Sequence, residues 1–338
     1  MTLAEKAHAS YQEGSRLVAP LMGFPGLQLR GGSIKLAQQN YGEHFGTVRA
    51  LAERFRPDLI FPLMDLSVEA NAFGCYTLFP VHKAATVVEE GFDISDIERW
   101  RRVNMTFDTR LQGYVETQKL MNIGLPEGML CGGYVSGPYT LAAMLMGSDN
   151  AAMATVLEPE TLHSLCSFAT EKIQEYTRLL ISAGAQVIGV LEPSAVMLGP
   201  EAFQSFSAEY IKHIRRSVDY TGVNIVYHTC GNTMHLLESM VDAGVHGVSL
   251  DAPEAGVDLP EAARRTPEDV AVIGNIHPAM TMVRGRSEDV REETDELLRA
   301  MDPYPHFILS TGCDLPEETP LENIQAFMDA GRQHRIKG

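Results

Sequence analysis

The chain alternates short apolar runs with longer amphipathic stretches. Several apolar runs contain no polar residue, which is typical of parallel strands covered on both faces. Alternation of such runs with helical stretches predicts βα units and a parallel sheet. The predicted strands are Leu17–Leu21, Leu59–Met64, Met129–Val135, Gln186–Leu191, Val223–Tyr227, Gly247–Leu250, Val270–Ile273 and Phe307–Leu309.

The stretches between these runs carry apolar residues at helical spacing. The pattern predicts helices over Pro159–Ser182, Pro200–Ser217, Asn232–Ala243 and Ser287–Met301, the last with Ser287 as its N-cap. Eight strands alternating with helices favour an α/β fold, a single (β/α)8 TIM barrel with a helical N-terminal region. A doubly wound open sheet is the alternative, but no Gly-rich dinucleotide fingerprint follows the first strand.

One segment, Thr77–Gly124, does not follow the alternation of strands and helices. We interpret it as a helical insertion between the second and third strands. The whole chain, residues 1–338, is expected to form one barrel domain, since α/β barrels reach this length as single domains.

Composition and charge narrow the functional classes. The chain has 45% hydrophobic and 21% charged residues, as globular proteins do, and a formal net charge of −17. Such acidity argues against a nucleic-acid partner. The N-terminus lacks the apolar core of a signal peptide, and no apolar run reaches the roughly 18 residues of a membrane span. With five sparse cysteines, we expect a cytoplasmic protein with reduced thiols that does not associate with membranes.

The candidate functional residues lie where the fifth and eighth predicted strands end. His228 and Cys230 follow the run Val223–Tyr227, and their spacing of two places both side chains on one face of an extended backbone. Cys313 follows the last run. In a barrel these strand ends share the face where active sites form. Two thiolates and one imidazole suit Zn²⁺, and three protein ligands leave one coordination position open, as in catalytic zinc sites.

Other interpretations of these residues stay open. A His-x-Cys pair also arises by chance, and cysteine is often a small buried apolar residue. A structural zinc site would usually have four ligands close in sequence. Asp251 and Glu192 close the sixth and fourth strands. Either is a candidate fourth ligand, a group that orients His228 by a hydrogen bond, or a polar rim residue.

The seventh strand is followed by Asn275 and His277, which are candidate contacts to a substrate. His277 could act as an acid or base. Its alternative role is that of a loop residue with a local hydrogen bond.

With these residues identified, the chain resembles the uroporphyrinogen decarboxylase superfamily over nearly its whole length. It is most similar to the branch of cobalamin-dependent methyltransferases that act on thiols such as coenzyme M. That resemblance implies a (β/α)8 barrel whose zinc is bound by His228, Cys230 and Cys313. The matching surroundings are Phe61–Ala70, Ser136–Gly147, Leu191–Phe203 and Ser310–Ile324.

The departures from the decarboxylases favour the methyltransferase branch. Where the decarboxylases carry an Arg-rich stretch, this chain has Pro20–Gly26 without arginine, followed by a single Arg30. Their active-site Tyr, Ser and His correspond to Met144, Pro193 and Cys313. Their pyrrole-binding Asp is kept as Asp65, either for structure or to face a different ligand. A polycarboxylate substrate without cationic partners would be costly to bind.

The resemblance implies a methyl transfer from a methylcorrinoid, carried as a co-substrate on a separate corrinoid-binding protein, to a small-molecule acceptor. The acceptor would be a thiol such as coenzyme M, activated by zinc, or tetrahydrofolate. The alternatives are a decarboxylase-like lyase and a non-catalytic tetrapyrrole-binding protein. A monomer and a homodimer both fit the sequence.

Overall fold

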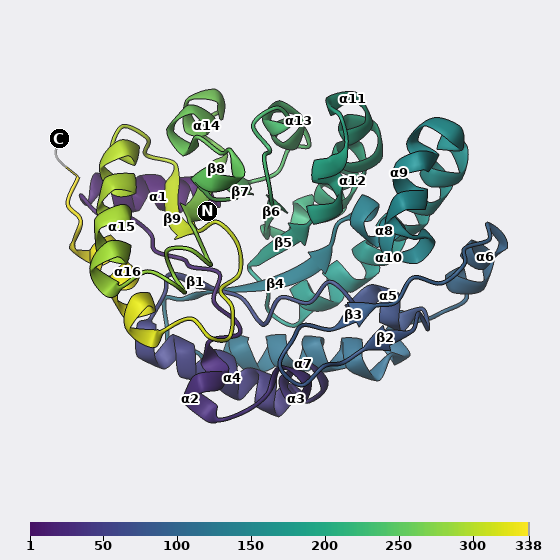
Figure 1. Ribbon diagram of the computed structural model, residues 1–338, viewed down its shortest axis with the longest axis horizontal. Coiled ribbons are helices and arrows are strands. Elements are labelled where there is room, and N and C mark those ends of the chain that lie inside the picture. Colours follow the sequence, from purple (N-terminus) through teal and green to yellow (C-terminus); the bar gives the residue numbers. More distant parts are fainter. Residues whose placement is uncertain (337–338) are drawn as a thin grey trace.

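The computed structural model describes residues 1–336 and contains a curled sheet of parallel strands surrounded by helices (Figure 1). Within the sheet the strands follow the order β1-β4-β5-β6-β7-β8-β9, and each neighbouring pair is parallel. Their bounds are β1 (Leu59–Ile60), β4 (Leu130–Ser136), β5 (Val187–Leu191), β6 (Asn224–Thr229), β7 (Gly247–Leu250), β8 (Ala271–Ile276) and β9 (Phe307–Thr311). All residues of β5 and β6 are buried, as expected for parallel strands that are covered on both faces.

A short segment around Val18 lies between the two edge strands of this sheet. On one side the N–H of Ala19 donates to the carbonyl of Leu309 in β9 at 2.8 Å. On the other side the N–H of Asp58 donates to the carbonyl of Val18 at 3.0 Å, just before β1. Backbone hydrogen bonds therefore connect the segment to both ends of the curled sheet.

Two predicted strands are shorter in the structure than their apolar runs. The run Leu17–Leu21 forms only a single bridge, and the run Leu59–Met64 forms only the two-residue β1. Pro20 and Pro62 interrupt them, because proline has no N–H to donate to a neighbouring strand. Apolar content alone was therefore a poor guide to strand length at these two positions.

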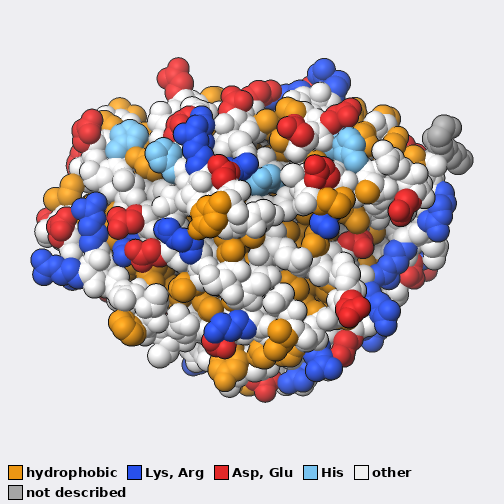
Figure 2. Space-filling model, turned by 180° about the vertical axis from the view of Figure 1, so that it is seen from behind, with side chains coloured by type: hydrophobic (Ala, Val, Ile, Leu, Met, Phe, Trp, Pro, Cys, Tyr) orange, Lys and Arg blue, Asp and Glu red, His pale blue; other side chains and the backbone are white. Residues whose placement is uncertain are grey.

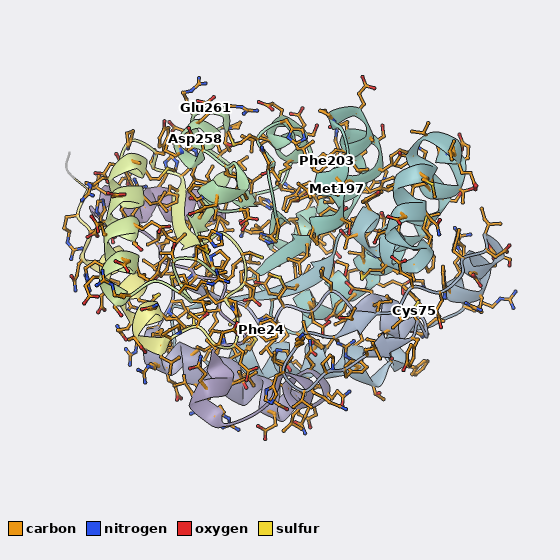
Figure 3. The ribbon with its side chains drawn as sticks, viewed as in Figure 1. Phe24, Cys75, Met197, Phe203, Asp258 and Glu261 are labelled. Atoms are coloured by element: carbon orange, nitrogen blue, oxygen red, sulfur yellow. The ribbon has the colours of Figure 1, made fainter. Side chains whose placement is uncertain are left out.

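Helices cover the outer face of the sheet. Their bounds are α1 (Leu3–Gln12), α2 (Gly26–Arg30), α3 (Ile34–Gln39), α4 (Tyr41–Phe55), α5 (Val68–Ala72), α6 (Ser95–Arg101), α7 (Thr109–Gly124), α8 (Pro138–Met146), α9 (Ser148–Leu157), α10 (Pro159–Ser182), α11 (Pro200–Phe203), α12 (Glu209–Arg216), α13 (Leu237–Asp242), α14 (Leu259–Arg265), α15 (Ser287–Met301) and α16 (Leu321–Gln333). A side-chain cap begins α14, where the Asp258 carboxylate accepts the N–H of Glu261 at 3.0 Å (Figure 3).

Two of the predicted helices have the expected bounds, α10 and α15. The N-cap of α15 is Arg286 and not Ser287, because the Asp289 carboxylate accepts the Arg286 N–H at 2.9 Å. The predicted helix Pro200–Ser217 is interrupted by a π-helical turn between α11 and α12. Only the second half of the predicted helix Asn232–Ala243 is helical, as α13.

The segment Thr77–Gly124 between β1 and β4 is only partly helical. It contains α6 and α7, but it begins with two short antiparallel strands, β2 (Thr77–Leu78) and β3 (Thr86–Val87). The sequence pattern did not predict this pair, because two-residue strands leave no alternation to detect.

The interior of the curled sheet is filled by side chains from alternate strand positions and from α1. Phe61 stacks on Tyr134, with ring centroids 4.5 Å apart, and a Cβ atom at Gly132 would lie only 2.2 Å from the Phe61 ring. At the N-terminal end of the strands, Leu3 of α1 packs into the same cluster, and its N–H donates to Asn224 Oδ1. This end is therefore covered by α1, which leaves the C-terminal ends of the strands as the place for a site.

Charged side chains of both signs are interspersed on the face opposite to that of Figure 1 (Figure 2). Among residues 1–336, no helix combines the length and the apolar character that a membrane span requires.

Candidate metal centre

Three sulfur and nitrogen donors converge at the C-terminal ends of β6 and β9. Cys230 Sγ lies 3.4 Å from His228 Nε2 and 3.3 Å from Cys313 Sγ, and Cys313 Sγ lies 3.8 Å from His228 Nε2. His228 is the fifth residue of β6, Cys230 follows that strand, and Cys313 lies two residues beyond β9. The structure thus brings together the three residues that the sequence selected.

These distances fit a single tetrahedral zinc ion. Zn–S bonds of about 2.3 Å and Zn–N bonds of about 2.0–2.1 Å imply donor separations of roughly 3.8 Å between sulfurs and 3.6 Å between sulfur and nitrogen. The observed separations differ from these values by a few tenths of an ångström. The two thiols and the imidazole are also the soft donors that zinc prefers.

The imidazole of His228 is oriented by a neighbouring strand. Its Nδ1 lies 3.0 Å from the hydroxyl oxygen of Ser249 in β7, so Nε2 is the nitrogen that faces the two cysteines. Burial alone lowers the pKa of His228, but the hydrogen bond to Cys313 and the charges of Cys313, Asp251 and Asp314 outweigh it and raise the pKa. The hydrogen bond to Cys230 and burial hold the pKa of Cys313 well above its ordinary value.

Asp251 closes β7, and its carboxylate is engaged by backbone groups. It accepts the N–H of Gly231 and the N–H of Ala252, each at 2.7 Å. Since Gly231 directly follows Cys230, this bond fixes the turn that carries the cysteine. These contacts give Asp251 a role in positioning the loop, which is not one of the roles considered from the sequence. The group that lies beside His228 Nδ1 is Ser249.

Glu192 is fully buried and points toward α8. Its carboxylate accepts the N–H groups of Tyr139 and Thr140 at 2.9 and 2.8 Å and the hydroxyl of Ser207 at 2.7 Å. Burial raises the pKa of Glu192, and these hydrogen bonds oppose that rise. The carboxylate caps the N-terminus of α8, where the helix dipole favours negative charge.

Asn275 and His277 have different surroundings. Asn275 is 1% exposed, and its side-chain N–H donates to the backbone carbonyl of Asp251 at 2.8 Å. His277 Nδ1 accepts the N–H groups of Ala279 and Met280 at 3.1 and 3.2 Å. His277 thus has the local loop hydrogen bonds considered as its alternative role, whereas Asn275 is buried beside the backbone of Asp251.

A family model for uroporphyrinogen decarboxylase matches residues 46–334 of the chain. The chain belongs to the uroporphyrinogen decarboxylase family. A uroporphyrinogen decarboxylase of Prochlorococcus marinus is 30% identical over 287 residues, which cover 82% of this chain and 80% of that protein. A methylcobamide:CoM methyltransferase of Methanosarcina acetivorans is 26% identical over 283 residues, which cover 80% of this chain and 78% of the relative.

The fold of this family member also matches a solved structure of a methyltransferase from Methanosarcina mazei. The TM-score is 0.85 at 20% sequence identity, and the match covers 98% of both chains. Both the decarboxylase and the methyltransferase members of the uroporphyrinogen decarboxylase family are thus similar to this chain. The residues of the site therefore decide whether this chain is more like the decarboxylases or the methyltransferases.

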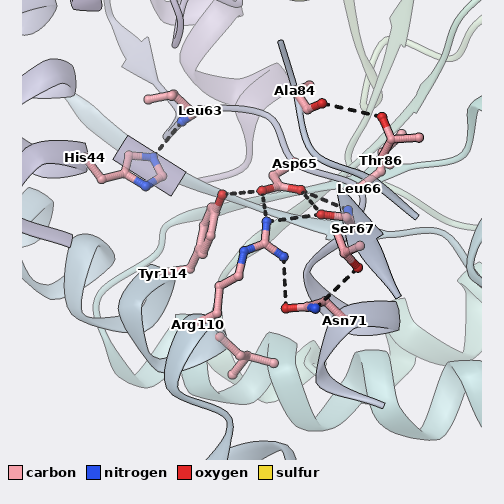
Figure 4. A network of polar contacts seen from close by, with 12 residues as sticks. His44, Leu63, Asp65, Leu66, Ser67, Asn71, Ala84, Thr86, Arg110 and Tyr114 are labelled. Atoms are coloured by element: carbon pink, nitrogen blue, oxygen red, sulfur yellow. Dashed lines mark hydrogen bonds and ion pairs between the residues drawn. The ribbon is translucent and has the colours of Figure 1, made fainter. Parts of the chain in front are cut away.

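The aspartate shared with the decarboxylases, Asp65, is saturated by neighbours within this chain (Figure 4). Its carboxylate accepts hydrogen bonds from the hydroxyl of Tyr114 at 2.6 Å and from the N–H and the hydroxyl of Ser67 at 2.9 and 2.7 Å. It also forms an ion pair with the guanidinium of Arg110. The Asp65 side chain is 1% exposed and that of Arg110 is 9% exposed. Of the two roles considered for Asp65, these contacts favour the structural one.

The other positions that differ from the decarboxylases do not supply a replacement for their cationic stretch. Arg30 ends α2 and pairs with Glu43 at 3.2 Å, with about 40% of both side chains exposed. Met144 is half-buried on α8, and Pro193 begins a 3-10 turn after β5.

Three residues of the site were not selected from the sequence. Ser249 lies inside an apolar run, and Arg110 lies in the segment that did not fit the strand and helix pattern. Asp314 follows Cys313, and burial raises its pKa to about 7. Of these three residues, only Asp314 could have been selected from the sequence, because it is an acidic residue directly beside a proposed ligand.

Proposed function

We propose that this protein is a zinc-dependent methyltransferase that moves a methyl group from a methylcorrinoid, carried on a separate corrinoid protein, to a small thiol. The observation that carries the proposal is the convergence of His228 Nε2 and the sulfurs of Cys230 and Cys313 at the mouth of the curled sheet. The similarity to a methylcobamide:CoM methyltransferase supports it.

His228, Cys230 and Cys313 would hold the zinc ion. When bound, zinc would lower the pKa of a coordinated thiol and so supply a thiolate nucleophile at neutral pH. The hydroxyl of Ser249 is hydrogen-bonded to Nδ1 of His228, which orients the ring so that Nε2 faces the metal position. Asp251 keeps Cys230 in place through the N–H of Gly231. Three protein ligands leave one position for the acceptor thiol.

The reaction is a single displacement. The acceptor sulfur loses its proton and forms a bond to the methyl carbon, while the cobalt–carbon bond of the methylcorrinoid breaks and its electron pair stays on cobalt. The protein contributes alignment of the sulfur with the methyl group, which converts a bimolecular encounter into a positioned reaction.

A decarboxylase-like lyase is the second candidate, because many relatives carry that name. The saturated Asp65 opposes it, since this carboxylate has no acceptor capacity left for the N–H groups of a tetrapyrrole without breaking its pair with Arg110. Tetrahydrofolate is an alternative methyl acceptor. With that acceptor, zinc would have a different role in the reaction.

The test is methyl transfer by the zinc-reconstituted protein under reducing conditions. Free methylcobalamin is offered with a panel of thiols or with tetrahydrofolate, and loss of the cobalt–carbon bond is followed by optical absorption. We expect thiol-dependent demethylation that the Cys313→Ser variant lacks. A zinc-loaded protein that demethylates methylcobalamin with none of these acceptors, but decarboxylates a porphyrinogen, would overturn the proposal in favour of the lyase.

A further inference from the structure

A cationic hollow lies where α6 and the turn that follows it contact α10. Its volume is about 460 Å³. Of the described residues that line it, four are cationic, Arg101, Arg102, Lys172 and Arg178, and one is acidic, Glu175. Helix α6 lies at the periphery of the molecule, on the side away from β9, so this hollow is separate from the metal centre (Figure 1).

The charge of the cationic hollow is opposite to that of the whole chain. The chain has 27 lysines and arginines against 44 aspartates and glutamates, whereas the lining of the hollow has four cations and one carboxylate. Arg101 also pairs with Glu98 at 2.9 Å, but both side chains are exposed, and such a pair contributes little. A concave site lined by one sign of charge concentrates ions of the other sign, so this hollow attracts anions.

Lys172 connects the two sides of the cationic hollow. Its side chain is only 5% exposed, and lysine is rarely so buried unless it is paired. Its Nζ donates to the two carboxylate oxygens of Glu175 at 3.0 and 3.2 Å, on the same helix, and to the backbone carbonyl of Val103 at 3.5 Å, just after α6. The ammonium group thus fixes the turn after α6 against α10.

Three side chains of the cationic hollow have donors that are available to a ligand. Arg102 ends α6 and Arg178 lies on α10; both are exposed, and neither forms an ion pair with an acidic side chain of residues 1–336. Asn104 Oδ1 accepts the N–H and the hydroxyl of Thr106 at 3.0 and 2.7 Å, which leaves its amide N–H groups to donate. Guanidinium and amide groups are donors that suit the oxygens of a phosphate.

We propose that the cationic hollow binds a polyphosphate, a chain of two or three phosphates that is either free or part of a nucleotide. The four cations exceed the one carboxylate by three charges. A single phosphate group carries only about 1.5–2 negative charges at neutral pH, whereas two or three linked phosphates neutralise the whole excess. The volume also lies within the range of small-molecule sites. This second site does not depend on the proposed function.

The test is isothermal titration calorimetry of the full-length protein with pyrophosphate, ADP, ATP, inorganic phosphate and hexaglutamate. Bound zinc is measured before and after each titration, because polyphosphates also chelate metal ions. Since each additional charge-assisted hydrogen bond strengthens binding, we expect pyrophosphate or a nucleotide to bind at least about tenfold more tightly than inorganic phosphate. Trp100, the single tryptophan of the chain, directly precedes Arg101, and its fluorescence provides a second measurement of binding.

Substitutions of exposed arginines test the site without disturbing the buried Lys172. Arg102→Gln and Arg178→Gln should each weaken pyrophosphate binding about tenfold, and the double variant should weaken it about 100-fold. The matched control combines Arg54→Gln on α4 with Arg216→Gln on α12. It removes the same charge at two exposed positions that do not line the hollow, and it should bind pyrophosphate as the wild type does.

Each outcome supports or overturns the polyphosphate site. Tighter binding of a nucleotide than of pyrophosphate assigns the site to nucleotides, the reverse assigns it to inorganic polyphosphate, and both support the inference. The inference is overturned if no polyphosphate binds, if inorganic phosphate binds as tightly, or if the two double variants lose the same affinity. Tighter binding of hexaglutamate than of pyrophosphate also overturns it, in favour of a surface for an acidic protein. None of these results bears on the methyl-transfer proposal.

Discussion

The Sγ atoms of Cys230 and Cys313 lie 3.3 Å apart, although 83 positions separate the two residues in the chain. The connection between them runs through Asp251. Its carboxylate accepts the N–H of Gly231, which follows Cys230. On the other side Gly312, which precedes Cys313, lies so close that a Cβ atom would be 2.6 Å from the backbone nitrogen of Ala252. One short stretch after β7 thus positions both cysteine loops.

We therefore expect Asp251 to control metal affinity without being a ligand. Asp251→Ala leaves the N–H groups of Gly231 and Ala252 without acceptors and should weaken zinc binding about tenfold, measured by competition with a chromophoric chelator. Asp251→Asn keeps one acceptor oxygen and should lose less. Wild-type affinity in both variants would contradict a positioning role for this carboxylate.

The hydroxyl of Ser249 has a related but separate task. Ser249→Ala should lower zinc affinity roughly 10- to 100-fold, because the Nδ1 of His228 loses the group that orients its ring. Ser249→Thr retains a hydroxyl and serves as the matched control in the same chelator titration. If the alanine variant holds zinc as tightly as the threonine variant, His228 does not depend on this contact.

The buried ion pair of Asp65 and Arg110 predicts non-additive effects on stability. Arg110→Met leaves the Asp65 carboxylate buried without its cation and should reduce the free energy of unfolding by about 3–5 kcal/mol. Combining it with Asp65→Leu removes the unpaired charge and should recover a large part of that loss. Urea unfolding of the two single variants and the double variant measures the coupling. Simple addition of the two losses would show that the pair is not coupled.

His44 predicts a pH dependence of stability. Its ring is fully buried, and burial first, with the Arg110 charge adding to it, lowers its pKa to about 3 against an ordinary 6.5. Between these values the unfolded chain binds a proton that the folded protein does not. Stability from this residue is therefore present above pH 6.5 and is lost as the pH falls toward 3.

His44→Gln provides the comparison, since a glutamine oxygen can still accept the N–H of Leu63 that His44 Nε2 accepts at 2.9 Å. The difference in the free energy of unfolding between wild type and variant should shift in favour of the variant as the pH falls from 6.5 to 4. A difference that does not change with pH would show that His44 takes up its proton in the folded state.

Much of the fold followed from local pattern, because fully apolar runs and helical spacing carry the information for β4 to β9 and for α10 and α15. The pattern failed where a single residue overrides it. Pro20 and Pro62 shorten two strands by removing an N–H, and the hydrogen bond from Asp289 makes Arg286 and not Ser287 the N-cap of α15.

The three candidate ligands could be selected from the sequence because their element order places them at strand ends that converge in a barrel. Their supporting residues could not. Ser249 and Arg110 act through contacts between elements that are distant in the chain, at 21 positions from His228 and 45 positions from Asp65. Spacing along the sequence contains no information on such contacts.

Metal content tests the central claim most directly. The protein is purified under reducing conditions, reconstituted with zinc, freed of loosely bound metal, and analysed beside the Cys313→Ala and Cys131→Ala variants. Cys131 is a buried thiol of β4 away from the cluster and serves as the control. We predict about one zinc ion per chain in the wild type and the Cys131 variant and loss of the ion in the Cys313 variant. Absence of zinc from the wild type, or equal zinc in all three proteins, would contradict the metal centre formed by His228, Cys230 and Cys313.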